Sequence, residues 1–320
     1  MTPPSSDLLV LGRAALESLE LTWPEIIDVL EDAFRQKAQG LVQNPPKPKV
    51  APRKGAFANA MPAYLGGSDA LGIKWVTGFE TNHANGLPYI YGTVIVNDPA
   101  NGRPIALLDG GWVTEMRTPG VSGVTMRHVP GAVRRLALIG YGAQGRRHLE
   151  VTLTEHPELE EVVVHDHHAE AAAAIRQAAV DCLVTVAETP TECVEGADLV
   201  ITTVTVPLEP RLDCLDTAAD ALLLPVDYGD AMSAVAVKDA SIFSVDDRAQ
   251  YASVAGVNHF FDFPEPDTEL ASVVTGEATV PESGRRMFLN MGIAMDDIAL
   301  ASLVLERATE RGIGQRIAFP

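Results

Sequence analysis

The segment from Gly140 to Gly145 has the residue types and the spacing of a dinucleotide-binding loop. It reads Gly-Tyr-Gly-Ala-Gln-Gly, follows the apolar stretch Leu136–Ile139 and precedes residues that favour a helix. In this G-x-G-x-x-G pattern the first glycine permits a tight turn, the second lets a pyrophosphate approach the backbone, and the third allows close packing of helix on strand. Free amide groups and the dipole at the helix start favour the phosphate charge. The pattern predicts cofactor contacts at Gly140, Gly142, Ala143, Gln144 and Gly145.

An acid stands where a dinucleotide-binding unit would contact the adenosine ribose. Asp166 ends a predicted strand about 20 residues after the glycine loop. Its carboxylate can accept hydrogen bonds from the ribose hydroxyls, and its charge disfavours a 2′-phosphate, so we expect NAD(H) rather than NADP(H). The alternative is that Asp166 only caps the next helix. Thr203, at the end of a later strand, is a second cofactor-binding candidate by its position.

Two cations in the preceding part of the chain could bind and protonate a substrate. Lys74 lies in the apolar stretch Leu71–Val76, and burial lowers the pKa of a lysine towards values useful for proton transfer. Arg117 could bind a carboxylate bidentately. From these residues alone, Lys74 could instead lie on an edge strand with its ammonium in water, and Arg117 could pair with Glu115 or Asp109.

The remaining metal-ligand side chains do not form a convincing site in the sequence. His165, His167 and His168 stand in or just after a predicted strand, where neighbouring residues point to opposite faces, so we expect no metal. The three cysteines are widely spaced and lack a C-x-x-C pair. They are typical of reduced thiols in an intracellular protein.

Charge and hydropathy exclude several classes of partner. The chain has 320 residues and a formal net charge of -19, which argues against binding to nucleic acid or to an anionic membrane surface. No apolar run reaches membrane-spanning length. The N-terminus lacks a basic region followed by an apolar core, so we expect no signal peptide and a cytoplasmic location.

The elements expected after residue 134 alternate between strand and helix. The pattern predicts strands at 136–140, 161–165, 199–203, 221–227 and 240–245. It predicts helices at 143–155, 169–180 and 191–196. This alternation is typical of an α/β fold with a doubly wound parallel sheet, the Rossmann type.

The first 130 residues follow a different pattern. A capping box at Thr22–Glu25 opens a helix that ends near Gly40. Strands are expected at 72–77, 89–97 and 104–108, and a helix at 112–129. A last amphipathic helix is expected from Ile293 to Arg311. The change of pattern near residue 130, just before the glycine loop, therefore predicts two domains.

Several ordered motifs make the chain resemble the ornithine cyclodeaminase/mu-crystallin family over nearly its whole length. In the first half these are Met61–Tyr64, Gly72–Lys74, Gly86–Pro88, Gly102–Pro104, Leu108–Gly110 and Thr114–Thr118. The loop Gly140–Gln144 resembles the family's G-x-G-x-Q loop. The segment Met291–Asp297 looks like its closing G-x-A-x-x-D helix start.

The resemblance implies a homodimer of two-domain subunits. An α+β substrate-binding and dimerisation domain would comprise 1–130 and 291–320, and a Rossmann NAD-binding domain 131–290. Members of the family include ornithine cyclodeaminase, an alanine dehydrogenase, ketimine reductases and the binding protein mu-crystallin. All of them handle an α-amino or α-imino carboxylate beside NAD(P).

The resemblance also implies roles for individual residues. Lys74 matches the lysine that contacts substrate and transfers protons, Arg117 matches a carboxylate clamp, and Asp230 falls at the position of the catalytic aspartate. We expect Arg53 to be a second carboxylate-binding arginine. Further contacts are expected from Met61 and Asn59 to the substrate and from Thr118 to the cofactor.

These matches favour an NAD(H)-dependent amino-acid dehydrogenase or imino-acid reductase. One alternative is an ornithine cyclodeaminase-type lyase, but Asn59 stands where the cyclodeaminases carry an acid for the distal amine of ornithine. Another alternative is a non-catalytic binding protein, against which the retention of Lys74, Arg117 and Asp230 speaks. The chain also departs from the family at Pro225 and Asp227, where members usually have Asn and an apolar residue.

Overall fold

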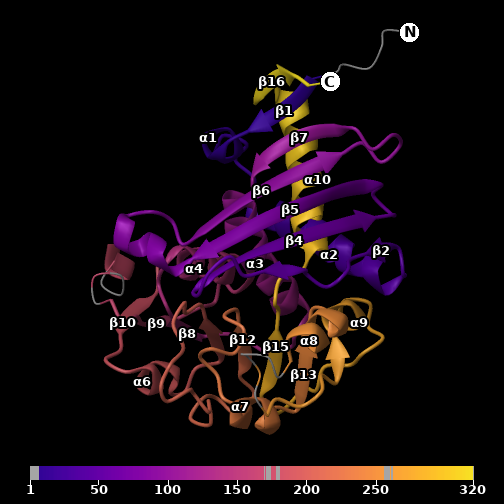
Figure 1. The fold of residues 1–320 in the computed structure, drawn as a ribbon. Helices are drawn as coiled ribbons and strands as arrows, with labels where there is room; N and C mark the ends of the chain where they lie inside the picture. Colours follow the sequence, from indigo (N-terminus) through magenta and orange to yellow (C-terminus); the bar gives the residue numbers. More distant parts are fainter. Residues whose placement is uncertain are drawn as a thin grey trace. The chain divides into compact units, whose positions relative to one another are not determined.

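The computed structural model describes residues 7–168, 170, 174–177, 181–255, 260 and 262–319. The chain divides into two compact units (Figure 1). Unit 1 comprises Met1–Arg117 and Ile293–Pro320, and unit 2 comprises Thr118–Gly292. The first division falls within helix α3 (Gly110–His128). The roles assigned to the parts 1–130 with 291–320 and 131–290 remain predictions.

Unit 1 is built on a mostly antiparallel sheet. Its strand order is β16-β1-β7-β6-β5-β4-β2, and β3 pairs with β4. Among the strand pairs of this sheet, the pair β1–β7 is parallel and the others are antiparallel. The strands are β1 (Asp7–Leu11), β2 (Val42–Gln43), β3 (Lys49–Val50), β4 (Ala56–Leu65), β5 (Ala70–Phe79), β6 (Ile90–Asn97), β7 (Pro104–Asp109) and β16 (Gln315–Ala318).

Two long helices pack on one another beside this sheet. Helix α10 (Ala294–Arg311) crosses strands β4, β5 and β6 on one face (Figure 1) and also packs against α2 (Trp23–Ala38). The predicted capping box opens α2, because the Thr22 amide donates to the Glu25 carboxylate at 2.8 Å. Helix α1 (Arg13–Glu17) and the 3₁₀ helix η1 (Glu80–Asn85) are short.

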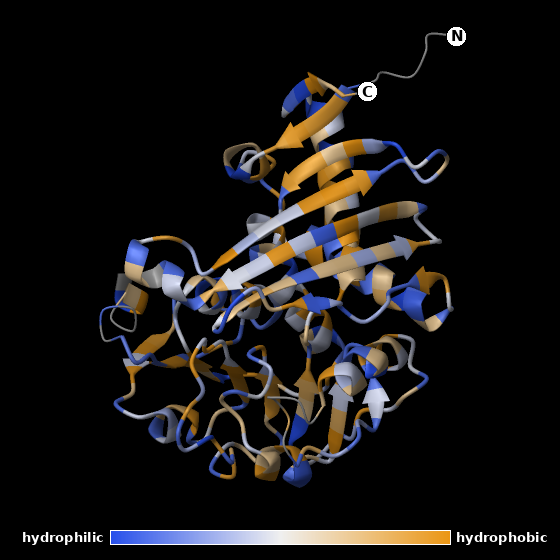
Figure 2. Ribbon diagram, viewed as in Figure 1, coloured by the Kyte–Doolittle hydropathy of each residue, from blue (hydrophilic) through white to orange (hydrophobic). Residues whose placement is uncertain are grey.

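Unit 2 contains the parallel sheet that the sequence predicted. The strand order β10-β9-β8-β11-β12-β15-β13-β14 runs to both sides from β8, which confirms the doubly wound α/β fold. Most of the strands are largely apolar (Figure 2), as expected for strands that are buried on both faces. They are β8 (Arg135–Ile139), β9 (Glu161–His165), β10 (Leu183–Val186), β11 (Leu199–Thr202), β12 (Leu222–Pro225), β13 (Ile242–Val245), β14 (Thr268–Glu269) and β15 (Arg286–Leu289).

The helices of unit 2 follow the predicted alternation. Those described are α4 (Ala143–Glu155), α6 (Pro190–Val194), α7 (Ala234–Asp239), α8 (Arg248–Val254), α9 (Leu270–Val274) and the 3₁₀ helix η2 (Ile175–Gln177). The helix expected over 169–180 lies mostly outside the described residues. Across the described ranges, every helix is too short or too polar to cross a bilayer.

Candidate active site

Lys74 lies in the interior of unit 1. Strand β5 has β4 and β6 on its two sides, so the edge-strand alternative is wrong. The side chain is only 1% exposed. Its ammonium donates to Asp297 Oδ1 at 2.5 Å and to Thr114 Oγ1 at 3.1 Å. A buried lysine requires such partners because an unpaired charge in the protein interior is costly.

Burial sets the proton affinity of this lysine. The pKa of Lys74 is lowered to about 7 because desolvation by burial, helped by the positive charge of Arg117, outweighs the opposing effect of the Asp297 carboxylate. An amine with a pKa near neutrality can both accept and donate a proton under physiological conditions. Lys74 therefore has the proton affinity of a general acid–base group.

Arg117 shares the acidic partners of Lys74. It lies one helical turn after Thr114 on α3, and its Nε donates to Asp297 Oδ1 at 3.2 Å. Its Nη1 lies 3.8 Å from Asp296 Oδ2. Glu115, one of the two partners considered from the sequence, binds Arg13 at 2.8 Å. The structure gives Arg117 an ion pair with the first turn of α10.

The two acids at the start of α10 were not predicted as site residues. Asp296 and Asp297 are both fully buried. Asp296 Oδ2 also accepts the Ile293 amide at 3.0 Å and so caps the helix. Burial raises the pKa of Asp296 to about 6, against the opposing effect of Arg117. The only signal in the sequence was a pair of adjacent acids in a motif, because 223 residues separate Asp297 from Lys74.

Two predicted substrate-binding residues lie on the same sheet face as Lys74. The register of β4 and β5 places Met61 directly opposite Lys74, and Asn59 opposite Val76. Residues two apart on a strand share a face, so Asn59 and Met61 both neighbour the lysine. Met61 is buried and Asn59 is half-buried.

Arg53 lies apart from the buried cluster on an exposed segment. Its guanidinium stands 5.9 Å from the centre of the Phe79 ring. Its role as a second carboxylate-binding arginine stays a prediction. The cofactor role of Thr118, half-buried in α3, likewise stays a prediction.

The glycine loop of unit 2 has the geometry that its sequence predicts. Gly140 has φ +92°, and a Cβ on Gly145 would stand 2.1 Å from the Gly140 carbonyl oxygen. Both positions therefore require glycine. A Cβ on Gly142 would meet nothing within 4 Å. Gly142 is the N-cap of α4, and no side chain caps this helix, so the loop presents open backbone amides, as a phosphate site requires.

Two hydrogen bonds of His148 hold α4 in place. Its Nδ1 donates to the Gln144 carbonyl at 2.8 Å, because a carbonyl oxygen can only accept. Its Nε2 therefore accepts from the Ser122 hydroxyl at 3.1 Å. Burial lowers the pKa of His148 to about 4. A neutral imidazole thus ties the start of α4 to the second half of α3.

Asp166 and Thr203 contact the glycine loop. Asp166 Oδ2 accepts the Tyr141 amide at 2.8 Å, and its Oδ1 accepts the His168 amide at 2.8 Å. The carboxylate therefore fixes the loop and also shapes the turn that follows β9. The Thr203 hydroxyl donates to the Gly140 carbonyl at 3.1 Å.

Asp230 follows β12 in a sharply turned loop. Tyr228 and Gly229 both have positive φ, 58° and 76°, and the Asp230 amide donates to the Asp227 carbonyl at 3.1 Å. Asp227 is 7% exposed, and burial raises its pKa to about 6, with the charge of Asp230 contributing. Two carboxyl groups thus lie at the carboxyl end of β12, where ligands of such sheets bind.

The histidines at the end of β9 and directly after it make other contacts in the structure. His165 Nδ1 lies 3.2 Å from the Ala187 carbonyl oxygen, and the rings of His167 and His168 contact each other. Within the described ranges no cluster of three or more His, Cys, Asp or Glu side chains could hold a metal ion.

Comparison with known proteins identifies relatives along the whole chain. The model of the ornithine cyclodeaminase/mu-crystallin family matches residues 8–312. The nodulation efficiency protein NfeD of Rhizobium meliloti is 30% identical over 315 residues, covering 97% of this chain and 98% of that protein. The alanine dehydrogenase of Archaeoglobus fulgidus is 27% identical over 324 residues, covering 98% and 99%.

A solved structure of a related enzyme has a similar fold. The Δ1-pyrroline-2-carboxylate reductase of Thermococcus litoralis, in complex with NADH and L-proline, has a TM-score of 0.85 at 25% identity. The match covers 97% of this chain and 100% of that one.

Proposed function

The chain belongs to the ornithine cyclodeaminase/mu-crystallin family, and we propose that it is an NAD(H)-dependent oxidoreductase acting on a small α-amino or α-imino carboxylate. The predicted family is thereby confirmed. The observation that carries the proposal is the buried pair of Lys74 and Arg117, which supplies a proton-transfer group and a carboxylate-binding charge together. The names of the alanine dehydrogenase and pyrroline-2-carboxylate reductase relatives support this substrate class.

The residues of unit 2 fit NAD(H). Gly142 leaves open space for a pyrophosphate beside the uncapped start of α4, and Asp166 places a carboxylate at the loop for the ribose hydroxyls. NADH is bound in the Thermococcus litoralis relative, which supports the predicted preference. Bound there, the cofactor would supply a hydride acceptor for the α-carbon of the amino acid, whose oxidation gives a cationic imine.

Unit 1 supplies the substrate contacts in this proposal. Arg117 attracts the substrate carboxylate, and its bond from Nε to Asp297 fixes the guanidinium. Met61 and Asn59 border the same position from β4. Fixing the carboxylate orients the α-carbon for hydride transfer, which removes much of the entropic barrier.

In this proposal Lys74 transfers a proton of the substrate nitrogen, and Asp230 stabilises the charge on that nitrogen. In the oxidative direction Lys74, in its neutral form, accepts a proton from the substrate ammonium through its Nζ. Asp230 stabilises the positive charge that develops on the nitrogen. The overall reaction converts an amino acid and NAD⁺ into an imino acid, NADH and a proton.

A set of assays tests the proposal. Purified protein is given NADH with pyrroline-2-carboxylate, or with pyruvate and ammonia, and loss of NADH is followed. Net NADH consumption supports a reductase. The lyase alternative predicts proline and ammonia from ornithine and NAD⁺ with no net NADH change, and cofactor binding without any turnover would favour a binding protein.

Replacement of Lys74 tests the site itself. The variant Lys74→Met should lower turnover by about 10²- to 10⁴-fold, as expected for loss of a general acid–base group. Binding of NADH, followed by its fluorescence, should be unchanged. Lys54→Met, which removes an exposed lysine, is the matched control. Full activity in the Lys74 variant would contradict the proposed site.

The proposal includes assembly as a homodimer through unit 1. The face of the sheet that α10 leaves uncovered carries apolar side chains. Trp75 is 45% exposed and Tyr91 is 48% exposed. The register pairs Trp75 with Thr93 and Thr77 with Tyr91, which puts both aromatic rings on that face. Exposed apolar faces of this kind mark association surfaces.

A further inference from the structure

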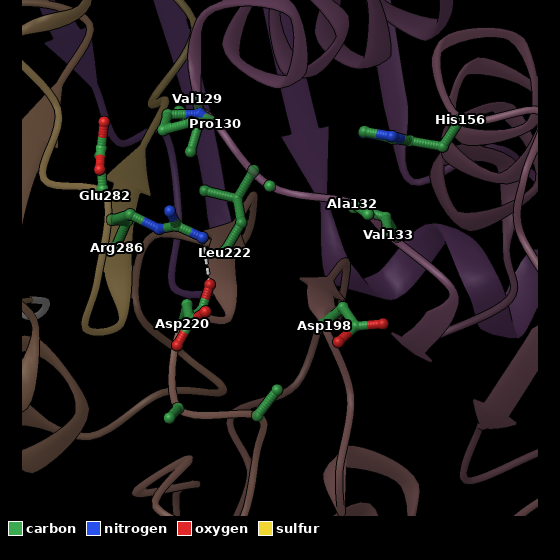
Figure 3. Close-up of a pocket in the computed structure, with 13 residues that line it drawn as sticks. Val129, Pro130, Ala132, Val133, His156, Asp198, Asp220, Leu222, Glu282 and Arg286 are labelled. Carbon is green, nitrogen blue, oxygen red and sulfur yellow. Dashed lines mark hydrogen bonds between the residues drawn. The ribbon is translucent and has the colours of Figure 1, made fainter.

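A cavity lies at the edge of the parallel sheet opposite to the glycine loop (Figure 3). Its lining comes from the segments that lead into β8, β11, β12 and β15, namely Val129–Val133, Asp198, Ala218–Asp220, Leu222, Glu282 and Arg286, together with His156. The amino ends of these parallel strands meet at one edge, whereas the glycine loop follows the carboxyl end of β8. The cavity volume is about 170 Å³.

Arg286 brings a buried positive charge to this cavity. It is 3% exposed. Among the described residues, the only hydrogen bond of its guanidinium goes from Nη2 to the Asp220 carbonyl oxygen, and no carboxylate forms an ion pair with it. Arginine is rarely buried without an anionic partner, because desolvating the charge is costly. The site therefore favours a ligand with a carboxylate, which a guanidinium binds in planar geometry.

Carboxylates line the same cavity. Figure 3 shows Arg286 and Glu282 on one side and His156 and Asp198 on the other. Asp198 is held rigidly, because its Oδ2 accepts the amides of Arg134 and Arg135, both at 2.9 Å. Asp220 adds a third acid to the lining. These acceptors disfavour a simple anion and favour a ligand that also carries an ammonium group.

The volume limits the size of the ligand. A protein cavity of about 150 Å³ admits benzene, with its six heavy atoms, and alanine has about as many. We propose that this cavity is a second binding site, for a small zwitterionic α-amino acid whose carboxylate contacts Arg286 and whose ammonium contacts the surrounding acids. It would act as an effector site. The inference rests on unit 2 alone and does not depend on the proposed reaction.

Calorimetry in a background without the proposed catalytic site tests this inference. The double variant Lys74→Met, Arg117→Met, loaded with NADH, is titrated with L-alanine. We expect binding of one alanine per chain. Adding Arg286→Met should weaken that binding by about tenfold or more, the loss expected for hydrogen bonds to a charged group. Absence of binding in the double variant, or unchanged affinity after the Arg286 change, would overturn the proposal.

Further variants separate the site from a folding effect. Arg285→Met is the matched control, because Arg285 binds Thr217 and Asp239 and does not line the cavity; alanine affinity should not change. Ala132→Leu fills the cavity from an exposed position and should abolish binding even if Arg286→Met fails to fold. Retained binding in the folded Ala132 variant would refute the site.

Ligand analogues test whether binding requires both the carboxylate and the ammonium group. Propionate lacks the ammonium group and ethylamine lacks the carboxylate, and each should bind about tenfold more weakly than L-alanine. Glu282→Gln, at an exposed position of the lining, should weaken alanine binding but not the binding of propionate, whose negative charge Glu282 opposes. If propionate binds as tightly as alanine, the site is a simple anion site and the proposal is wrong.

Discussion

At the scale of single residues, one buried cluster determines the chemistry available to unit 1. Lys74 and Arg117 share the carboxylate of Asp297, and Asp296 lies beside them. Two positive and two acidic groups in one dry environment can balance each other, but each also shifts the proton affinity of its neighbours. The position of the acids therefore helps to set the pKa of Lys74.

The pH dependence of turnover should reveal this coupling. Oxidation requires neutral Lys74, so kcat/KM should fall as pH drops below about 7, the pKa of this buried lysine. In Asp297→Asn the carboxylate no longer raises that pKa, so the midpoint should move to lower pH, by about one unit. A pH–rate profile measures the shift, and thermal unfolding verifies that the variant is folded. A midpoint that stays in place or rises would contradict the assignment.

The glycine loop allows a paired test of cofactor binding. In Gly142→Ala the new methyl group enters open space, so the melting temperature should not change, but the affinity for NADH should fall by about tenfold or more because the methyl group blocks the pyrophosphate. In Gly145→Ala the methyl group would collide with the Gly140 carbonyl oxygen. That variant should lose both affinity and melting temperature, as calorimetry and thermal unfolding would report. Equal behaviour of the two variants would count against a phosphate contact at Gly142.

At the scale of elements, local signals predicted the long helices and the strand–helix alternation at the start of unit 2, but not the short helices α7, α8 and α9. Helix α4 has the predicted bounds and α10 begins one residue later than predicted, because glycines and charged or capping residues mark their ends. Strand β4 was missed. Its sequence contains Pro62 and several alanines, which are poor strand formers. It forms because it pairs with β5 along its full length.

The same reasoning explains what the sequence revealed of the candidate site. The glycine loop and Asp166 could be predicted because one local unit contains both. Lys74 and Arg117 could be named as candidate site residues from the sequence, but their hydrogen-bond partners could not be predicted. Asp297 reaches Lys74 only through the packing of α10 on β5, and no local pattern specifies that packing.

The contact between α2 and α10 is open to a direct test. Glu25 caps α2 and also binds Arg307 of α10 at 2.5 Å, and this bond, together with the hydrogen bonds from Thr22, lowers the pKa of Glu25 to about 2. Glu25→Gln should lower the melting temperature by about 2 °C, because the amide can still accept from Thr22 but no longer forms the ion pair with Arg307, which is worth up to about 1 kcal/mol. The exposed Glu306→Gln on α10 is the control.

The contribution of Glu25 to the stability of the fold should decrease as the pH falls. A carboxylate whose pKa is depressed in the folded state stabilises above its unfolded pKa, here 4.5, and loses this contribution as pH falls towards 2. The difference between wild type and Glu25→Gln should therefore shrink over that range in thermal unfolding. A difference that grows on acidification would exclude this ion pair as its cause.

At the scale of the whole molecule, the chain returns to its first unit at its end. Strand β16 pairs with β1, and α10 covers the sheet formed by residues before 110. The uncovered face of that sheet carries Trp75 and Tyr91. A chain with a formal net charge of -19 repels its copies at long range, so association depends on apolar contact that salt does not weaken.

The proposed dimer makes a prediction at this scale. Trp75→Glu places a charge in the centre of the apolar face and should convert the dimer into monomers, as measured by sedimentation equilibrium. Val206→Glu, at an exposed apolar position of unit 2 that is 61% exposed, should leave the dimer intact. A dimer that survives Trp75→Glu would place the interface elsewhere.

The return of α10 to unit 1 also orders events during synthesis. Lys74 leaves the ribosome long before Asp297, which is 223 residues further along the chain. Domains usually fold in the order of translation, yet here unit 2 is complete at Gly292 while the first sheet still lacks its last helix and the counter-charge of its buried lysine. The segment synthesised first is therefore the one that finishes folding last, and until then its apolar face must be kept from aggregation.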